Sequence, residues 1–268
     1  HCKYFWDDKT KFTAFSENKK FLKEVKNKFQ VDESVVNEYL KKAKTKYDLT
    51  EKIFLKKSLH KFSSFLNIET IKALFNLNIF QINRTLNEVN SDELKNKYLI
   101  QIFDRYATYN GSSPYKTPGM MTLIQHLENH YGTFIPNGGM YEIAKAIFNL
   151  AKHVGVKFHF NCNVDEIILE KNIAKKIRVN NELIESDIIV SNVDVNFTYK
   201  ELLKQKFKHR SLNNESSSSA LIFYWGVKGT YDELDLHNIF FSSNYKEEFN
   251  AIFEKKEIFD DPTVYVNI

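Results

Sequence analysis

The sequence predicts a mixed α/β (α+β) fold, because helical and strand patterns follow one another along the chain. Apolar residues recur at helical spacing through most of the first 132 residues. A strand–helix–strand pattern follows at 133–160, and short apolar runs typical of strands continue after it. The 43% hydrophobic and 15% aromatic content excludes a disordered chain, and 268 residues suffice for one large domain or two small ones.

The N-terminal region begins with a predicted β-hairpin, "CKYFWDDKTKFTAFS", in which two aromatic-rich strands flank a polar turn. The segment Glu17–Phe29 follows, with its apolar residues on one helical face. Asp32 or Ser34 is expected to cap a second helix. The apolar positions of these two helices are Phe21, Leu22, Val25, Phe29, Val35, Val36, Tyr39, Leu40, Ala43 and Tyr47.

Further helices are predicted in the next fifty residues. Residues 48–62 and 67–77 are expected to be helical, and "ALFNLNIFQI" at 73–82 is a conspicuously apolar patch. The polar triplet at 91–93 should open a helix that continues to Phe103, because acidic and hydroxyl side chains are typical of a helix start.

The loop "FDRYATYNGSSPYKTPGMM" combines an acidic residue, a basic residue and several aromatic rings between two predicted helices. Loops of this composition often line a pocket. Asp104 and Arg105 are therefore candidate site residues, and the alternative is an ordered connector in which they only form salt bridges. Thr117 is expected to cap the next helix, which has a proline at its first position and ends at Gly132.

Two adjacent glycines, Gly138 and Gly139, precede a predicted helix at Gly139–Val154, between the predicted strands "TFIP" and "VKFHF". Bare backbone at a helix start allows a phosphate or a flat cofactor to come close. It also allows a helix to pack tightly on a sheet. The pattern alone is compatible with both interpretations.

The remainder of the chain is predicted to consist mainly of strands. "ESDIIVSNVD" at 185–194 looks like a buried strand of an α/β sheet. The other predicted strands are 164–170, 174–180, 216–227, 236–243 and 263–268, and a short helix is predicted at 197–207.

Positive charge is concentrated in the N-terminal part of the sequence. Residues 1–61 contain 16 lysines and nine acidic side chains, whereas the whole chain has a net charge of +4. Basic, phenylalanine-rich helices suit an anionic membrane surface, and the alternative is a solvated lysine face. No helix-turn-helix, finger or RRM signature is present, so a nucleic-acid partner is not expected. No apolar run reaches the length of a spanning helix.

The sequence contains no complete nucleotide-binding or metal-binding motif. The GxGxxG and GK[ST] patterns are absent, and no serine or cysteine lies in an elbow motif. Cys2 and Cys162 have no partners at metal spacing, which favours a reducing, cytoplasmic compartment. His126 and His130 share a helical face, but no carboxylate ligand accompanies them, so no metal site is expected.

Several longer motifs are more specific. They are "FDRYATYNGSSPYKTPGMMTLIQHLE", "GTFIPNGGMYEIAKA", "GVKFHFNCNVDEI", "SDIIVSNVDV", "SSSALIFYWGV", "LDLHNIFFS" and "DDPTVYVNI". Together, and in this order, they resemble the bacterial carotenoid (phytoene) desaturases, which are FAD-dependent members of the flavin amine-oxidase-like superfamily. The N-terminal segments look nearest to the 1-hydroxycarotenoid 3,4-desaturase branch. The resemblance covers essentially the whole chain.

This resemblance implies a partial, doubly wound FAD-binding domain and a substrate domain made of a mixed sheet and helices. Residues 1–132 would form part of the substrate domain with a membrane-contact region, 133–195 the middle piece of the FAD-binding domain, and 196–268 the substrate-domain strands. Family members open with a GxGxxG unit and close with another glycine-rich FAD segment, which this chain lacks. The chain is therefore expected to be an interior fragment of a longer protein.

The resemblance also implies which residues contact FAD. In the resembled fold, the turn containing Gly138, Gly139 and Met140 lies close to the flavin. Val164 matches the position whose main chain pairs with the adenine edge, and Asn192 lies in the strand end beside the cofactor.

The implied reaction removes two hydrogens from adjacent carbons of a C40 polyene, with hydride passing to FAD, while the protein positions the apolar chain and excludes water. Asp104 would handle the proton or stabilise positive charge, with Arg105 orienting it; a structural ion pair is the alternative. The carotenoid substrate implies that the protein is cytoplasmic and in peripheral contact with the inner face of the cell membrane, through the apolar segment "ALFNLNIF" at 73–80 and neighbouring lysines.

Two other functions fit the same residues. Another flavin oxidoreductase of the superfamily, acting on a different apolar or amine substrate, would share the architecture. A non-catalytic isoprenoid- or lipid-binding module would have kept the substrate domain and lost the cofactor domain. Flavin content and activity on carotenoids distinguish the three.

Overall fold

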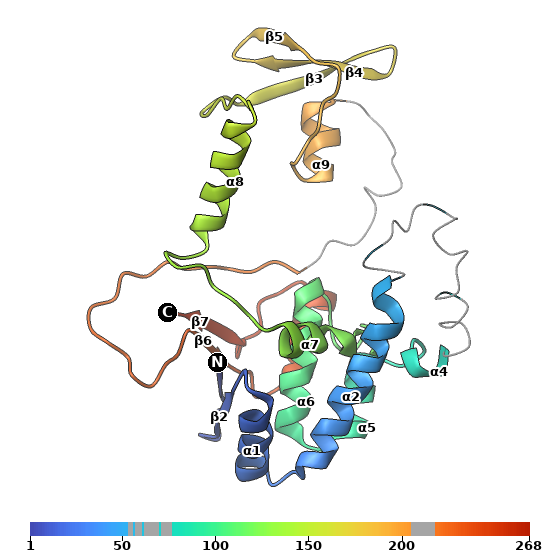
Figure 1. Cartoon of the computed structure of the whole chain (residues 1–268), viewed down its shortest axis with the longest axis vertical. Helices are drawn as coiled ribbons and strands as arrows, with labels where there is room; N and C mark the ends of the chain where they lie inside the picture. The colour runs from blue at the N-terminus through green and yellow to red at the C-terminus, as the bar shows by residue number, and fades with distance from the viewer. Residues whose placement is uncertain (53–55, 57–60, 62–69, 71–76, 205–217) are drawn as a thin grey trace. The chain divides into compact units, whose positions relative to one another are not determined.

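The computed structural model describes residues 1–52, 56, 61, 70, 77–204 and 218–268 (Figure 1). The chain divides into two compact units: unit 1 comprises 1–134 and 217–268, and unit 2 comprises 135–216. Helices occur together with one mixed and one antiparallel sheet, which confirms the predicted α/β (α+β) class.

Unit 1 contains a four-stranded mixed sheet in the order β2-β1-β6-β7. The predicted hairpin is confirmed by β1 (Cys2–Phe5) and β2 (Lys11–Ala14), which pair antiparallel. β6 (His237–Phe240) lies parallel to β1, and β7 (Val264–Asn267) lies antiparallel to β6. Two segments more than 230 residues apart in the sequence therefore form the centre of one sheet.

Two long helices follow the hairpin. α1 (Asn18–Phe29) and α2 (Glu33–Thr50) confirm the prediction, and the Asp32 carboxylate caps α2 by accepting a hydrogen bond from the Ser34 N–H at 2.8 Å. Val35 is 37% exposed, although it was predicted on the apolar face. Among the described residues, unit 1 also contains the α-helices α4 (Leu77–Phe80), α5 (Leu86–Leu94), α6 (Lys97–Asp104), α7 (Ile124–His126) and α10 (Tyr245–Asn250).

The helix predicted to start at 91–93 is instead two helices. A capping box at Thr85 and Glu88 starts α5 earlier, so the polar triplet lies in its last turns. Lys95 then adopts a left-handed conformation with φ of 52°, and the Asn96 side chain caps α6. The prediction was wrong because capping depends on which hydroxyl or amide reaches the free N–H groups, not on the polar pattern alone.

The predicted cap at Thr117 is also wrong. Its buried hydroxyl has no hydrogen-bond partner among the described residues, and its carbonyl accepts from the Leu86 N–H at 2.7 Å. Helical turns start after Pro118 and end at Gly132, which has a positive φ of 78° as expected of a stop signal. Most of the predicted helices at 48–62 and 67–77 lies outside the described residues.

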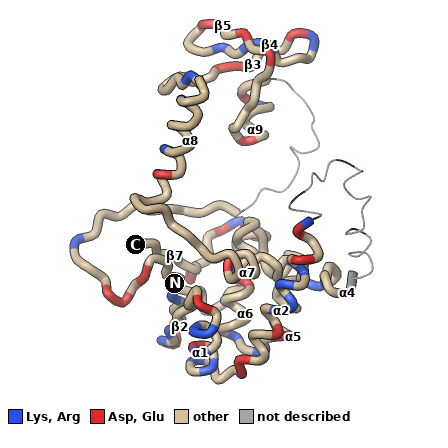
Figure 2. The backbone as a smooth tube through the Cα atoms, in the orientation of Figure 1, with Lys and Arg blue, Asp and Glu red and all other residues tan. Residues whose placement is uncertain are grey.

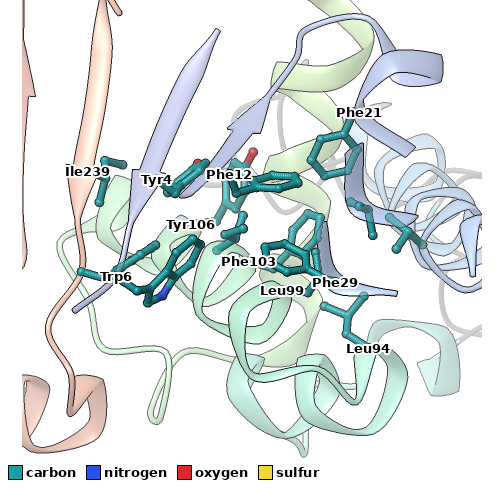
Figure 3. Packing of buried hydrophobic residues seen from close by; sticks show 14 of the residues in the cluster. Tyr4, Trp6, Phe12, Phe21, Phe29, Leu94, Leu99, Phe103, Tyr106 and Ile239 are labelled. Atoms are coloured by element: carbon teal, nitrogen blue, oxygen red, sulfur yellow. The ribbon is translucent and has the colours of Figure 1, made fainter. Parts of the chain in front are cut away.

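An aromatic-rich core holds unit 1 together (Figure 3). The inner face of the sheet packs against α1, α2 and α6, and ring contacts connect all of these elements. The buried members of this core are Tyr4, Trp6, Phe12, Phe21, Leu22, Val25, Phe29, Val36, Tyr39, Leu94, Leu99, Ile102, Phe103, Tyr106, Ile239, Phe241, Tyr245 and Phe249.

The described part of unit 2 contains a long helix, an antiparallel sheet and a short helical segment. α8 (Tyr141–His153) confirms the predicted helix. β3 (Val164–Glu170) and β4 (Ile173–Val179) confirm two predicted strands, and β5 (Glu182–Glu185) completes the order β3-β4-β5. A helical segment at 195–202 (α9 is Val195–Phe197) matches the start of the helix predicted at 197–207, and residues 205–207 lie outside the described ones.

Four predicted strands form no ladder in the structure. The segments are 133–136, 156–160, the described part of 216–227, and 185–194 from residue 187 onward, because Glu185 ends β5 and the Ser186 N–H still donates to the Lys175 carbonyl at 3.0 Å. In 185–194, the predicted buried strand, Val190 is 85% exposed. An extended segment becomes a strand only when a neighbour accepts and donates its backbone hydrogen bonds, and the described residues supply no such neighbour here. The doubly wound arrangement of unit 2 therefore stays a prediction.

Candidate functional site

Asp104 lies at the end of α6 in a buried polar cluster of unit 1. Its side chain is 1% exposed, and both carboxylate oxygens accept hydrogen bonds from amides of α5. Asn87 Nδ2 donates to Oδ2 at 2.6 Å, and Asn90 Nδ2 donates to Oδ1 at 2.8 Å. The hydroxyl of Tyr39, on α2, donates to Asn90 Oδ1 at 2.5 Å. The cluster therefore connects three helices through four side chains.

The local sequence explains this placement. Asn87 and Asn90 are three residues apart on α5, so both amides are on the same helical face. Because α5 packs against α6, that face meets the Asp104 carboxylate. The motif "NEVN" carries this spacing, and a search for paired amides on one helical face would have found it in the sequence.

Burial raises the pKa of Asp104 to about 6, and the hydrogen bonds from Asn87 and Asn90 oppose part of that rise. In an apolar interior the ionised carboxylate loses its hydration, and two neutral amides replace it only in part. The Asp104 carboxyl is therefore able to bind a proton only slightly below neutral pH.

This raised pKa makes the stability of unit 1 depend on pH. Below about pH 4 the carboxyl is protonated in both the folded and the unfolded chain. Between pH 4 and 6 only the folded chain keeps the proton, so stability falls as pH rises, by about 3 kcal/mol for two pKa units. We expect wild type to lose this much stability relative to Asp104→Asn between pH 4 and 7, measured by urea unfolding. A stability difference that does not change with pH would contradict the assignment.

Arg105 does not orient Asp104, and the two side chains do not form an ion pair, so both sequence-based interpretations of their contact are wrong. The guanidinium points instead to the sheet, where Nη2 donates to the Tyr4 hydroxyl at 3.1 Å. It also lies 5.2–5.7 Å from the ring centroids of Tyr4, Tyr106 and Tyr109. Adjacent residues at the end of a helix point in different directions, so neighbours in sequence need not meet.

The turn before α8 has the geometry that the glycine pair suggested. Gly138 and Gly139 have φ values of 91° and 93°, which disfavour any residue with a Cβ. A Cβ on Gly139 would meet no atom within 4 Å, so no part of unit 2 packs against it. Met140 follows with a side chain that is 62% exposed. The backbone at Gly139 is therefore open to an approaching group, whereas a Cβ on Gly138 would lie 3.0 Å from Cγ of Glu142.

The other two residues predicted to contact a cofactor lie elsewhere in unit 2. Val164 is the first residue of β3, where it pairs with Val179 of β4. Asn192 is exposed in the extended segment 185–194. Figure 1 shows the glycine turn at one end of α8 and the start of β3 near the other end. Because 13 helical residues span about 20 Å, the turn and Val164 do not form one compact site.

The described residues provide no metal site. Within them, no group of three or more His, Cys, Asp and Glu side chains could hold an ion. The rings of His126 and His130 stack at 4.7 Å on the helical turns before Gly132. No described helix is both long and apolar enough to cross a bilayer.

The model of the family described as flavin containing amine oxidoreductase matches residues 3–228. The chain belongs to this family. It is 44% identical over all 268 residues to a 1-hydroxycarotenoid 3,4-desaturase of Flavobacterium sp. (strain P99-3), of which it covers 55%. It is 32% identical over 182 residues to a phytoene desaturase of Neurospora crassa, with 63% of this chain and 30% of that protein covered.

A 4,4'-diapolycopene oxygenase of Methylomonas sp is 31% identical over 199 residues, which cover 73% of this chain and 39% of that protein. This family member thus spans about half the length, or less, of these curated relatives. The solved structure of an oxidoreductase from Methanosarcina mazei is 21% identical in sequence, with a TM-score of 0.35. The match covers 49% of this chain and 33% of the Methanosarcina chain.

Membership of this family implies a flavin cofactor. The turn at Gly139 fits the close approach of such a group, because a Cβ there would meet no atom within 4 Å. The described residues contain no GxGxxG turn for cofactor phosphates.

Proposed function

We propose that this chain acts in an FAD-dependent carotenoid desaturase, which removes two hydrogens from adjacent carbons of a C40 polyene such as phytoene or a 1-hydroxycarotenoid. The observation that carries the proposal is the 44% identity over the whole chain to a protein named 1-hydroxycarotenoid 3,4-desaturase. The phytoene desaturase of Neurospora crassa adds support from a second organism. FAD, when bound, supplies the acceptor for the hydride.

The cofactor contacts in this proposal come from unit 2. Gly139 leaves backbone open toward the flavin end, with Met140 beside it, and the positive φ of Gly138 and Gly139 keeps side chains out of the turn. The main chain of Val164 contacts the adenine end, and Asn192 lies beside the cofactor. This division rests on the resemblance and is supported by the separation of the turn from β3.

Asp104 is the proposed proton-handling residue, because its pKa of about 6 lets one carboxyl bind and release a proton near neutral pH. Asn87 and Asn90 hold it in position, a role that sequence reasoning had given to Arg105. Arg105 instead joins the end of α6 to the sheet through Tyr4.

A C40 polyene dissolves in the apolar part of a bilayer, which supports peripheral contact of a cytoplasmic protein with the inner face of the cell membrane. The apolar segment at 73–80 was predicted to provide this contact. Its first four residues lie outside the described ones, and the final part includes α4.

The proposal is tested with the full-length protein that contains this chain. Incubation with phytoene, and separately with 1-hydroxycarotenoids, should give products that absorb at longer wavelength as conjugated double bonds are added, and the purified protein should contain FAD. Bound flavin with turnover only of an amine or another apolar substrate would favour a different oxidoreductase of the family. Carotenoid binding without flavin or turnover would favour a non-catalytic binding module.

A further inference from the structure

Arg105, which directly follows α6, is the one described arginine without an ion pair. Arg84 pairs with Asp92. Arg178 pairs with Glu166 at 3.2 Å. No described carboxylate lies within 4 Å of the Arg105 guanidinium. Acidic and basic residues are interspersed along α1 and α2 (Figure 2), so opposite charges are common in unit 1, and the missing partner is particular to Arg105.

Burial makes this missing partner unfavourable. Exposed lysines without ion pairs, such as Lys9 and Lys28, are hydrated by the solvent. Arg105 instead has a buried Nε whose N–H finds no hydrogen-bond acceptor among the described residues. A guanidinium has five N–H donors, and this one makes a single described hydrogen bond, from Nη2 to the Tyr4 hydroxyl at 3.1 Å. A buried donor without an acceptor is costly, so the site favours a ligand that supplies one.

Three tyrosine rings surround the guanidinium, with centroids 5.2–5.7 Å from its Cζ atom. Their electron-rich faces stabilise the positive charge, but they do not replace the missing hydrogen-bond acceptor. Tyr4 and Tyr106 are buried, whereas Tyr109 is 59% exposed. The guanidinium site therefore reaches the surface of unit 1 at Tyr109.

Glu128 makes the site unsuited to an anion. Its Oε2 accepts a hydrogen bond from the Tyr109 hydroxyl at 2.9 Å. Burial and, after it, the negative charge of Glu128 raise the pKa of Tyr106 well above its ordinary value, so this charge is felt beside the guanidinium. A bound carboxylate or phosphate would be repelled by Glu128, whereas a hydroxyl oxygen would not. The arrangement therefore fits a neutral oxygen acceptor attached to an apolar molecule.

We propose that the Arg105 guanidinium donates a hydrogen bond to the hydroxyl oxygen of a hydroxylated carotenoid, and that it makes the protein prefer this substrate to a hydrocarbon such as phytoene. The inference deepens the proposed function and rests on it for the carotenoid class. Arg105 is in unit 1, within the predicted substrate domain, whereas the predicted cofactor contacts are in unit 2. The exposed ring of Tyr109 offers an apolar face to the chain next to the hydroxyl. A hydrocarbon would displace water from the guanidinium without giving it an acceptor.

The test compares two carotenoids that differ only in the hydroxyl group. Their binding to the full-length, flavin-loaded protein is measured by quenching of tryptophan fluorescence, which requires no turnover, and kcat/KM is measured on the same preparation. We expect wild type to prefer the hydroxylated carotenoid roughly 100-fold, because one hydrogen bond to a charged group is at stake. In Arg105→Met, whose thioether donates no hydrogen bond, the two carotenoids should differ by less than about threefold. Each preference is a ratio within one preparation, so a partly unfolded sample does not change it.

Two further variants keep the test specific. Arg105→Lys retains a cation at the same position in case the methionine variant does not fold. It should lower the preference by roughly tenfold, because one ammonium replaces the forked donors. Arg84→Met is the matched control, since it makes the same change at an exposed, ion-paired arginine of unit 1. Its preference should stay within about twofold of wild type.

Several outcomes would overturn the proposal. One is a wild-type protein that binds both carotenoids equally, or binds neither. Another is a preference that survives in both Arg105 variants. Loss of flavin from Arg105→Met with an unchanged preference would assign the residue to the cofactor instead. A binding preference that depends on Arg105, without desaturation of either carotenoid, would support the inference while rejecting the proposed reaction.

Discussion

Replacing Asn90 by alanine should lower the free energy of unfolding of unit 1 by roughly 4 kcal/mol. Asn90 is completely buried, and its amide both donates to Asp104 and accepts from the Tyr39 hydroxyl. Alanine leaves a carboxyl oxygen and a hydroxyl without this partner in the interior, and each buried unsatisfied group costs about 1–3 kcal/mol. Urea unfolding, followed by the fluorescence of the buried Trp6, measures the change.

Two companion variants make this result specific. Asn27→Ala, at an exposed position of α1, should change stability by less than about 0.5 kcal/mol. Tyr39→Phe removes only one hydrogen bond of the cluster and should cost about 1 kcal/mol. If Asn90→Ala lost no more stability than Asn27→Ala, the cluster would not be the polar core of unit 1 that the structure shows.

Phe103→Ala should destabilise unit 1 by a similar amount, roughly 4 kcal/mol, through loss of apolar contact rather than of hydrogen bonds. The Phe103 ring is 2% exposed and lies 4.8 Å from the ring of Tyr39 and 6.1 Å from that of Tyr106 (Figure 3). Truncation leaves a cavity among rings that α2, α6 and the following turn hold in place, so the site cannot collapse easily.

The control for this prediction is Ile82→Ala, because that side chain is 51% exposed and should cost less than about 0.5 kcal/mol. Both variants are compared in the same urea titration. Equal small effects would show that α6 is not packed as described, whereas a large loss confined to Phe103→Ala supports the packing in Figure 3.

Local periodicity predicted the elements whose stability depends on one buried face. α1 and α2 formed as expected, because the buried residues of each helix lie on one face. Phe21 and Val25 are four positions apart on α1, and Tyr39 is on the buried face of α2. The hairpin formed because its two short strands pair and place Tyr4, Trp6 and Phe12 in the core, with the less buried Phe5 between the first two. Boundaries were less predictable, since the break between α5 and α6 depends on capping by the Asn96 side chain.

The candidate site likewise combines features that the sequence predicted with contacts that only the fold reveals. Sequence identified Asp104 and the open glycine turn as unusual, and motif order predicted the family that the comparison then showed. Asn87 and Asn90, the actual partners of Asp104, were missed although their spacing places both amides on one helical face, because that spacing does not say which residue of another helix they meet. Lys46 is another case: it is one of the 16 lysines of the basic region, yet it is buried and donates to Gln81 and Thr122.

The sequence by itself determined the helical faces, the hairpin and the family, because these depend on spacing and on residue types within short segments. Only the tertiary structure decided that β1 pairs in parallel with β6, that Arg105 contacts Tyr4 and not Asp104, and that 187–194 has no strand partner among the described residues. The physical reason is that strand pairing and buried hydrogen bonds join groups far apart in the chain, and their partners are fixed only when the whole fold brings them within about 3 Å.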